Sequence, residues 1–251
     1  MRILAFLNQK GGVGKTTTTL NVGAGLANLK KRVLLIDLDP QASLTYSLGF
    51  DPQELSLTLY EFLKQECLFE EAAITKDNLT LLPASISLSG FEKECLELPN
   101  KEYILKHTLK SLKQFDYILI DCPPSLGFLT INALAIAQEV LIPVQTEFLA
   151  LQGLIQLQDT IAVIQTHINP KLRIGGIIGT RFNRRKIHKD VMEFLQIHFR
   201  DKTFNTVIRE NIALAEAPSF GKTIYDHNPT CNGAKDYKTL CKEIIKQEKS
   251  L

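Results

Sequence analysis

The sequence predicts an α/β protein built on a mostly parallel, twisted β-sheet with helices on both faces. Short apolar runs alternate with longer stretches of helical period along the whole chain, and this alternation is typical of parallel strands joined by crossover helices. The short runs are almost continuously apolar, as expected for strands that helices cover on both sides. No internal repeat or Pro/Gly-rich linker marks a boundary, so we expect a single domain over residues 1–251.

The strand candidates are the apolar runs themselves, beginning with RILAFLN and RVLLIDLD. In chain order, the predicted strands are residues 2–8, 32–39, 79–84, 117–123, 139–144, 173–180 and 203–208. The stretches of helical period lie between these runs or after the last one. They predict helices at residues 16–29, 57–66, 101–113, 127–137, 150–168, 188–199 and 232–248.

Composition limits the classes of function that need to be considered. The 251 residues are 45% hydrophobic, which is enough to bury the core of one sizeable α/β domain. The formal net charge is only +2, so no strong overall field draws the molecule to nucleic acid or to a membrane. Any binding of a polyanion must therefore use local patches of charge.

The cysteines and the apolar segments indicate the compartment. Five cysteines without a CxxC pair or regular spacing are interpreted as small buried residues in a reducing environment: Cys67, Cys95, Cys122, Cys231 and Cys241. The first apolar run is too short for a secretory signal, and no segment is long enough to span a bilayer. The sequence thus predicts a cytoplasmic protein without stable membrane insertion.

Residues 9–19, QKGGVGKTTTT, follow the first predicted strand and open the first predicted helix. Glycines in this place let backbone N–H groups turn inward, and the start of the helix adds its positive end, so the segment suits a phosphate. Lys15 would reach the β- and γ-phosphates of a nucleotide, and the Thr16 hydroxyl would coordinate Mg²⁺. A glycine turn without a ligand is the alternative. The predicted nucleotide-binding residues of this loop are Gly11, Gly12, Val13, Gly14, Lys15, Thr16 and Thr17.

Two acidic segments end later strands of the predicted sheet. They are DLDPQAS at 37–43 and ILIDCPPS at 118–125. Carboxylates at the C-terminal edge of a parallel sheet lie where ligands bind in doubly wound folds. Two alternatives stay open, because Asp39-Pro40 can simply open a turn and Asp121 can simply cap a buried strand.

The glycine loop departs from the strict phosphate-loop pattern GxxxxGK[ST], because Gln9 stands at its first glycine. QKGGVGKTT resembles the deviant Walker A motif of the ParA/MinD family of P-loop ATPases, and its glutamine is similar to that of ParA members. The resemblance implies a P-loop NTPase fold with ATP and Mg²⁺ as cofactors. It also implies that Lys10 crosses the interface of an ATP-bound homodimer and touches the phosphates held by the other subunit. A Lys10 side chain that merely points to solvent is the alternative.

The same resemblance assigns roles to the acidic segments. It implies that Asp39 orients the attacking water with support from Asp37, and that Asp121 holds Mg²⁺ through water. The switch residues are then Asp37, Asp39, Pro40, Pro123 and Pro124.

A lysine supplied by a second subunit has a physical consequence for the rate of hydrolysis. A cation placed in trans on the transferring phosphoryl group can raise the rate about 10³- to 10⁵-fold. A chain that depends on such a cation should hydrolyse ATP slowly when alone, so it would act as a switch rather than as a metabolic catalyst. Lys10, Lys15 and Asp39 are the predicted catalytic residues.

The second half of the chain carries two further segments that resemble the family. TRFN at 180–183 makes Asn183 the candidate for recognising adenine. VIRENIALAEAPSFGKTI at 207–224 keeps the EAPSFGK part of a family hallmark but has Arg209, Glu210 and Ala213 where the family has proline, arginine and arginine. Arg209 is included among the predicted nucleotide-binding residues. The arginine replaced by Ala213 helps the family bind DNA, so this departure bears on DNA binding.

Local basic clusters remain as candidates for DNA binding. The run RFNRRKIHK at 181–189 holds five basic residues and no acid, and lysines 235, 238, 242, 246 and 249 fall on one stripe of the C-terminal helix. An amphipathic helix with solvated lysines is the alternative for this stripe. Binding to phosphates would be independent of base sequence, since nothing here resembles a recognition helix. The predicted DNA-binding residues are Arg181, Arg184, Arg185, Lys186, Lys242 and Lys246.

Taken over residues 2–246, the resemblance implies a short ParA-like ATPase that partitions chromosomes or plasmids. An ATP-bound dimer would bind double-stranded DNA non-specifically on the nucleoid, and a ParB-like partner would stimulate hydrolysis. Because the first predicted strand begins at residue 2, we expect no N-terminal helix-turn-helix. A MinD-like membrane ATPase and a metabolic enzyme on the same scaffold are the alternatives.

Overall fold

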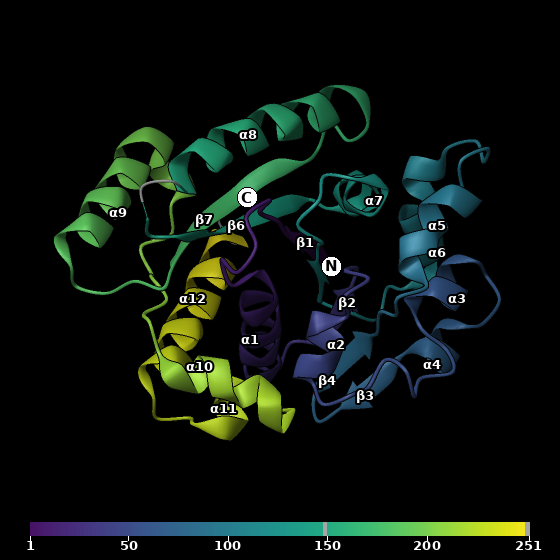
Figure 1. Ribbon diagram of the computed structural model, residues 1–251, viewed down its shortest axis with the longest axis horizontal. Helices are drawn as coiled ribbons and strands as arrows, with labels where there is room; N and C mark the ends of the chain where they lie inside the picture. The colour runs from purple at the N-terminus through teal and green to yellow at the C-terminus, as the bar shows by residue number, and fades with distance from the viewer. Residues whose placement is uncertain (148–149, 249–251) are drawn as a thin grey trace.

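The parallel strands place their C-terminal ends along one edge of a single sheet, as Figure 1 shows for the computed structural model of this chain. The structure describes residues 1–147 and 150–248, and within them the strand order is β3-β4-β2-β5-β1-β6-β7. Of the strands in these two ranges, only the short β3 pairs antiparallel, in a hairpin with β4. The strand bounds are β1 Arg2–Phe6, β2 Val33–Asp37, β3 Ile74–Lys76, β4 Leu79–Leu82, β5 Tyr117–Asp121, β6 Glu139–Gln145 and β7 Arg173–Thr180.

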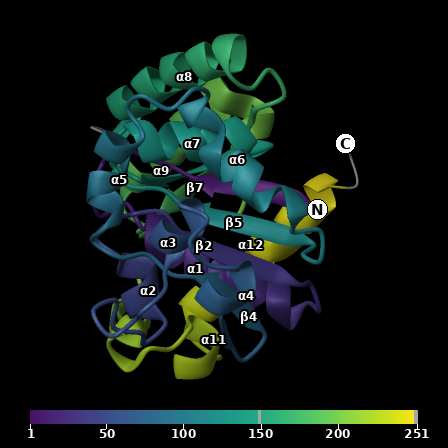
Figure 2. The same cartoon turned by 90° about the vertical axis from the view of Figure 1, so that its right-hand side faces the viewer.

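The helices connect these strands and pack on both faces of the sheet. Their bounds are α1 Lys15–Asn28, α2 Ser43–Ser47, α3 Leu59–Leu63, α4 Phe69–Ala72, α5 Leu88–Glu94, α6 Ile104–Thr108, α7 Phe128–Ile136, α8 Ala150–His167, α9 Lys186–Phe199, α10 Ile212–Glu216, α11 Ile224–His227 and α12 Asn232–Glu248. Short 3₁₀ helices are η1 Lys101–Tyr103, η2 Leu109–Ser111, η3 Arg200–Lys202 and η4 Ala217–Phe220. Figure 2 shows α7 and α8 on one side of the sheet and α1, α11 and α12 on the other.

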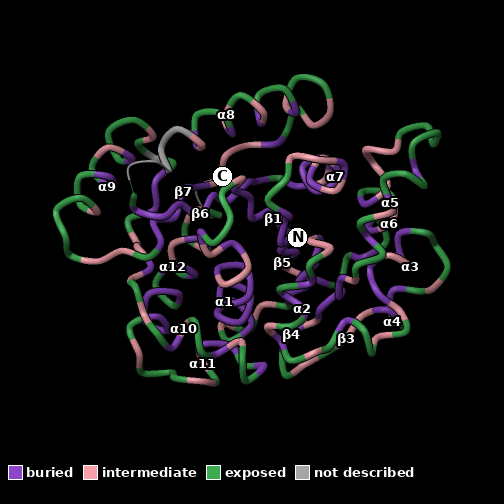
Figure 3. Tube along the Cα trace, in the orientation of Figure 1, coloured by how far each residue is buried: buried purple, intermediate pink, exposed green. Residues whose placement is uncertain are grey.

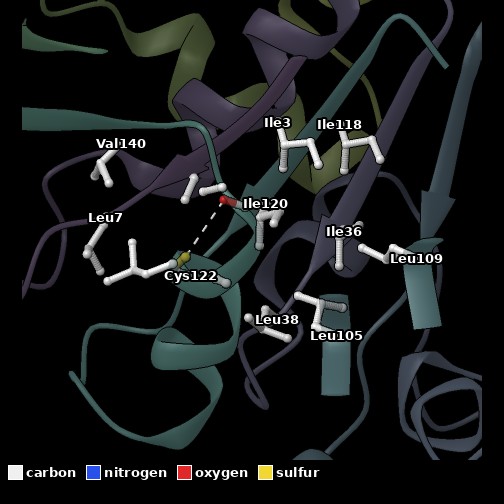
Figure 4. Close-up of a cluster of buried hydrophobic side chains, with 14 of the residues drawn as sticks. Ile3, Leu7, Ile36, Leu38, Leu105, Leu109, Ile118, Ile120, Cys122 and Val140 are labelled. Carbon is white, nitrogen blue, oxygen red and sulfur yellow. Dashed lines mark hydrogen bonds between the residues drawn. The ribbon is translucent and has the colours of Figure 1, made fainter. Parts of the chain in front are cut away.

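Two hydrophobic cores follow from the two-residue period of the strands. On β1, Ile3 and Ala5 face one core, which α3, α5, α7, α8 and α9 cover, and part of this core appears in Figure 4. Leu4 and Phe6 face the other core, under α1 and α12. Both faces of the central strands are therefore buried, as the purple segments of the tube in Figure 3 show. This arrangement confirms the α/β class predicted from the apolar runs.

Two predicted elements are wrong in detail. Residues 203–208 form no strand, because Glu243 of α12 accepts hydrogen bonds from the backbone N–H groups of Asn205 and Thr206. The segment meets β7 at an isolated bridge between Ile177 and Thr203 and through hydrogen bonds from the backbone N–H groups of Phe204 and Ile208. The helix predicted at 101–113 is divided into η1, α6 and η2, and Asn132 of α7 accepts from the backbone N–H of Leu105 at the start of α6.

The sequence pattern also missed β3 and several helices of one or two turns, namely α2, α4, α5, α10 and α11. Elements this short do not contain enough residues to display a periodic pattern. They matter for the site because α2 and α10 stand on either side of the glycine loop at the C-terminal edge of the sheet.

Candidate active site

The loop between β1 and α1 has the backbone shape that a phosphate requires. Gly12 and Gly14 have φ values of 72° and 88°, in the left-handed region that favours glycine. Gly14 caps α1 without a side-chain hydrogen bond, so the first N–H groups of the helix point toward the loop as a natural anion site. The carbonyls of Gly12 and Val13 accept from Gln145 and Thr180. The ends of β6 and β7 thereby hold the loop from behind.

Oxygen atoms suited to a divalent cation meet at the start of α1. Thr16 Oγ1 donates to Asp121 Oδ2 over 2.6 Å, and Thr19 Oγ1 donates to Asp121 Oδ1 over 3.2 Å. Hydroxyl and carboxylate oxygens are the protein ligands, direct or through water, that Mg²⁺ prefers. Lys15 is buried beside them, with 8% of its surface exposed. The residues predicted for phosphate and metal are thus brought together, and they fit a magnesium nucleotide.

The Asp121 carboxyl is poised between its charged and neutral forms. Burial raises its pKa to about 7, against the opposing effects of Thr16, Lys15 and Thr19. A bound cation would favour the charged form strongly. Binding of a metal ion would therefore keep Asp121 deprotonated, with its negative charge beside the metal.

Asp37 and Asp39 have different surroundings. Asp37 is fully buried, and its Oδ2 accepts from Thr45 N over 2.8 Å and from Thr45 Oγ1 over 2.7 Å. Burial, followed by the charge of Asp121, raises the pKa of Asp37 to about 8. Asp37 therefore anchors α2 to the end of β2. Asp39 lies half-buried at the same edge, where its Oδ1 accepts from the backbone N–H of Gln41 in a turn.

Lys10 stands at the surface before the glycines. Its Nζ lies 3.1 Å from Glu147 Oε2, and the two side chains are 42% and 56% exposed. Exposed ion pairs of this kind stabilise a protein by about 0–1 kcal/mol. Breaking the ion pair with Glu147 therefore costs little, so the Lys10 ammonium can bind another partner.

A cavity of about 730 Å³ opens beside the loop. Its walls are the loop with the start of α1, the serines of α2 and the segment around α10. The lining residues are Gly12, Val13, Gly14, Lys15, Thr16, Thr17, Ser43, Ser47, Thr180, Arg181, Ile208, Arg209, Glu210, Asn211, Ile212, Leu214, Ala215 and Tyr237.

Two of the predicted nucleotide-binding residues are bound to other parts of the protein. Arg209 lines the cavity, but its guanidinium is bound to Asp236 of α12, and Asp236 also accepts from the Arg209 backbone N–H. Asn183 does not belong to the cavity lining, and its Oδ1 accepts from the backbone N–H of Arg185. The roles assigned to these two residues stay predictions.

The predicted DNA-binding residues form two groups rather than one. Arg181, Arg184, Arg185 and Lys186 are exposed between the end of β7 and the start of α9, and Arg181 also lines the cavity. Lys242 and Lys246 are exposed on α12. They flank Ile244, whose carbonyl accepts from Arg2 at the start of β1. This second group therefore lies toward the opposite edge of the sheet, and Lys249 lies outside the described residues.

The lysine stripe of α12 belongs to a helix that is firmly docked. Tyr237, Leu240, Cys241 and Ile244 are at most 1% exposed and pack against α1. The Tyr237 hydroxyl also lies 3.1 Å from Thr18 Oγ1, one turn into the helix that follows the loop. The apolar face of α12 is accordingly buried in the protein's own core.

Membrane-spanning helices and self-sufficient metal clusters are both absent from the described part of the chain. Over residues 1–147 and 150–248, no helix combines the length and the apolar character needed to cross a membrane. Within the same ranges, no three His, Cys, Asp or Glu side chains are grouped so as to hold a metal ion by themselves. The Thr16 and Asp121 oxygens would thus need nucleotide oxygens and water to complete the coordination of Mg²⁺.

Sequence reasoning missed several polar residues that build the site. Thr19 carried a signal, because it lies three positions after Thr16 and therefore on the same face of α1. Thr45 and Thr180 carried none, since their hydrogen bonds with Asp37 and Val13 join distant parts of the chain. A sequence therefore reveals the residues that face the nucleotide better than the residues that hold them in place.

The first strand of the sheet leads through a left-handed glycine loop into a helix that begins with Lys15 and Thr16, and Asp121 at the end of β5 faces this helix start. This arrangement defines a P-loop nucleotide hydrolase. Comparison with known proteins specifies the family. A family model described as an AAA domain matches residues 1–174. The sporulation initiation inhibitor protein Soj of Bacillus subtilis is 45% identical over 247 residues, which cover 97% of this chain and 98% of that protein.

Two further relatives agree over nearly the whole chain. The chromosome partitioning protein ParA of Caulobacter vibrioides is 41% identical, covering 99% of this chain and 96% of that protein. A Mycobacterium smegmatis structure described as cobyrinic acid a,c-diamide synthase with a bound ATP analogue and magnesium has a TM-score of 0.89 and 38% identity. The match covers 100% of this chain and 96% of that one. The chain therefore belongs to the ParA/Soj family of partitioning ATPases, and the predicted family, fold class and ATPase activity are confirmed.

Proposed function

We propose that this chain is a single-domain partition switch of the cytoplasm, in which ATP and Mg²⁺ drive a homodimer onto the DNA of the nucleoid. The observation that carries the proposal is the hydrogen bond between Thr16 and Asp121 beside the left-handed glycine loop. It joins a phosphate site to a metal site in one pre-formed edge of the sheet. Relatives named for chromosome partitioning support the cellular role.

The residues of the loop hold and orient the nucleotide. The N–H groups from Gly11 to Thr17 and the Lys15 ammonium bind the phosphates, and Thr16 and Asp121 would hold the metal. Mg²⁺ bound there would neutralise charge that develops on the phosphate oxygens. We call residues 37–43 the switch I segment. In it, Asp39 orients the attacking water, and Asp37 keeps the segment in place through its two hydrogen bonds with Thr45.

Dimer formation supplies, from the other subunit, the lysine that stabilises charge on the transferring phosphoryl group. Lys10 is exposed and forms a surface ion pair with Glu147, so it is available to cross a twofold interface and reach the phosphates of the partner subunit. Pro123 and Pro124 follow Asp121 after Cys122 and form the second switch segment. ATP thus favours the dimer, and hydrolysis reverses it.

DNA binding uses the exposed basic run beside the cavity. Arg181 lines the cavity, and Arg184, Arg185 and Lys186 continue from it onto the surface at the start of α9. Lys242 and Lys246 add a second group of positive charges toward the other edge. Neutralised phosphates give affinity without base specificity. A ParB-like protein stimulates hydrolysis and thereby releases the DNA.

A synthase acting on a small molecule is the second candidate, because the Mycobacterium smegmatis relative was solved under such a description. A synthase of this kind consumes ATP when its acceptor is present, whereas a switch hydrolyses ATP without an acceptor and responds to DNA. A membrane ATPase of the MinD type is less compatible with the structure, since the apolar face of α12 is buried. Sedimentation with anionic liposomes and ATP tests that possibility.

The experiment that tests the proposed function measures binding to non-specific duplex DNA with no nucleotide, with ADP and with ATP, at two salt concentrations. We expect tight, salt-sensitive binding with ATP alone, and none with Lys15→Ala, which removes the ammonium that holds the phosphates. Lys113→Ala replaces an exposed lysine before β5 and serves as the matched control. Absence of binding in every state, with an ATP-dependent dimer intact, would contradict the DNA-binding role and leave the ATPase standing.

A further inference from the structure

Two walls of the cavity are fastened together by one lysine that lies outside the cavity lining. Lys76, the last residue of β3, donates from Nζ to the carbonyl oxygens of Leu48 and Gly221, each over 2.7 Å. Leu48 ends α2, and Gly221 follows η4. We call this pair of hydrogen bonds the Lys76 brace.

The backbones that the brace joins lie against each other. Gly49 and Gly221 both have left-handed φ values, of 85° and 60°. A Cβ atom on Gly221 would lie 2.7 Å from the Cα of Gly49, closer than side-chain carbons approach other atoms. Glycine is therefore required at Gly221, both by its conformation and by the space.

Each end of the brace leads to a different wall. On one side, α2 lines the cavity with Ser43 and Ser47, and its Thr45 is bound to Asp37 two residues before Asp39. On the other side, α10 lines the cavity with Leu214 and Ala215 and continues through η4 to Gly221. Between these two walls, α2 packs against η4, the 3₁₀ helix that leads from α10 to Gly221.

The Lys76 ammonium is well suited to hold these walls. The side chain is half-buried, its two acceptors are backbone oxygens, and the ring of Phe50 lies 5.7 Å from Nζ. Charged donors make stronger hydrogen bonds than neutral ones. Removing the ammonium would take a hydrogen-bond donor away from the carbonyls of Leu48 and Gly221 and would loosen both backbone segments.

We propose that Lys76 is a positioning residue for ATP hydrolysis, an inference that rests on the proposed function. It keeps α2, and with it the switch I segment that carries Asp39, at a fixed distance from the α10 wall. It acts without touching the phosphates, which belong to the loop after β1. Lys76 thus sets the placement of the attacking water rather than the affinity for the nucleotide.

The test is Lys76→Met, which keeps the length and apolar stem of the side chain but removes its charge and donors. We expect the single-turnover rate of ATP hydrolysis to fall about 10- to 100-fold, because a catalytic group misplaced by about 1 Å can cost about this much in rate. The affinity for ATP should stay within about twofold. Amide hydrogen exchange should rise at residues 43–49 and 212–221. Lys110→Met, at an exposed lysine of η2, is the matched control and should behave as the wild type.

Two further variants keep the proposal open to disproof. Lys76→Arg retains a charged donor and should restore most of the rate. Should Lys76→Met fail to fold, Gly221→Ala takes its place, since it separates the same two walls by steric repulsion and should lower the rate in the same way. A folded Lys76→Met variant, or a folded Gly221→Ala variant used in its place, that hydrolyses ATP as fast as the wild type overturns the proposal. A wild-type protein that does not hydrolyse ATP would instead overturn the proposed function.

Discussion

Thr16 Oγ1 lies 2.6 Å from Asp121 Oδ2, although 105 positions separate the two residues in the chain. The hydrogen bond exists because β1 and β5 pair in parallel, with Phe6 opposite Asp121, and α1 starts directly after the loop that follows β1. The fold itself therefore brings together the hydroxyl and the carboxylate expected to hold Mg²⁺. Groups that the fold holds in place need little reorganisation during a reaction.

The first prediction concerns the hydroxyl of Thr16. Thr16→Val keeps the shape of the side chain but removes the ligand and leaves buried Asp121 with one donor fewer, which costs about 1–3 kcal/mol. We expect Mg²⁺-dependent hydrolysis to fall at least about 100-fold, as it does when one electrostatic interaction that stabilises the transition state is removed. Nucleotide binding in EDTA should change little. Turnover assays over a Mg²⁺ titration measure the effect.

Thr16→Ser is the matched control, because it keeps the hydroxyl and should retain Mg²⁺-dependent hydrolysis. If the valine variant hydrolysed ATP at the wild-type rate with the same Mg²⁺ dependence, the assignment of Thr16 as the metal ligand would be wrong.

The second prediction follows from the titration of the buried carboxyls. Burial raises the pKa of Asp121 from 3.8 to about 7 and that of Asp37 from 3.8 to about 8. The folded protein thus keeps protons that the unfolded chain releases. In the nucleotide-free protein, this contribution to stability is complete below the unfolded pKa and is lost as the pH rises through the folded values.

The melting temperature of the nucleotide-free protein should therefore fall between about pH 4 and pH 8, which are the unfolded and folded pKa values of the two carboxyls, and Asp121→Asn should make that fall smaller. ATP with Mg²⁺ should also reduce it, since a cation favours the charged carboxylate. Differential scanning calorimetry measures the slope. Asp116→Asn is the control, because Arg32 lowers the pKa of Asp116 to about 2, outside this range. An unchanged slope in Asp121→Asn would show that Asp121 does not titrate in this way.

The sequence predicted the fold class and the residues of the loop because both depend on local patterns. Near-continuous apolar runs required strands covered on two sides, and the glycines at Gly12 and Gly14 marked a left-handed turn before a helix. Asp37 and Asp121 were placed at the correct edge because parallel strands end together. The brace at Lys76 could not be predicted, since its partners are carbonyl oxygens 28 and 145 positions away and no side-chain pattern records them.

The same limit applies to the charged surface. The lysine stripe of α12 and the basic run at 181–189 were recognised as local clusters, but their separation toward opposite edges depends on how α12 crosses the sheet. The pairing of Arg209 with Asp236 likewise joins two segments that only the tertiary structure brings together. Local composition reveals clusters of charged residues, but the packing of the elements decides which clusters lie on the same surface.

The third prediction separates the two basic groups. Arg185→Glu should weaken ATP-dependent binding to duplex DNA and should make the dependence on log[salt] shallower by about one for each phosphate that is no longer neutralised. The variant should still dimerise with ATP. Arg185 precedes α9 as its N-cap residue without a side-chain hydrogen bond, and an acidic residue is favourable near a helix N-terminus.

Lys242→Glu tests the second group in the same assay, and Lys110→Glu is the charge-matched control on the exposed side of η2. Fluorescence anisotropy with a labelled duplex gives the affinities. Loss of dimerisation together with DNA binding in Arg185→Glu would indicate that Arg185 supports the fold rather than the DNA.

In the proposed switch, ATP assembles a dimer in which Lys10 acts on the partner's nucleotide and Asp39 orients the attacking water. Light scattering can test this through the molar mass of Asp39→Ala, with Mg²⁺ and either ATP or ADP, beside Lys10→Ala under the same conditions. We expect a stable Asp39→Ala dimer with ATP, a monomer with ADP, and no such dimer in Lys10→Ala. If Asp39→Ala stayed monomeric with ATP and hydrolysed it at the wild-type rate, both the ATP-dependent dimer and the role of Asp39 would be wrong.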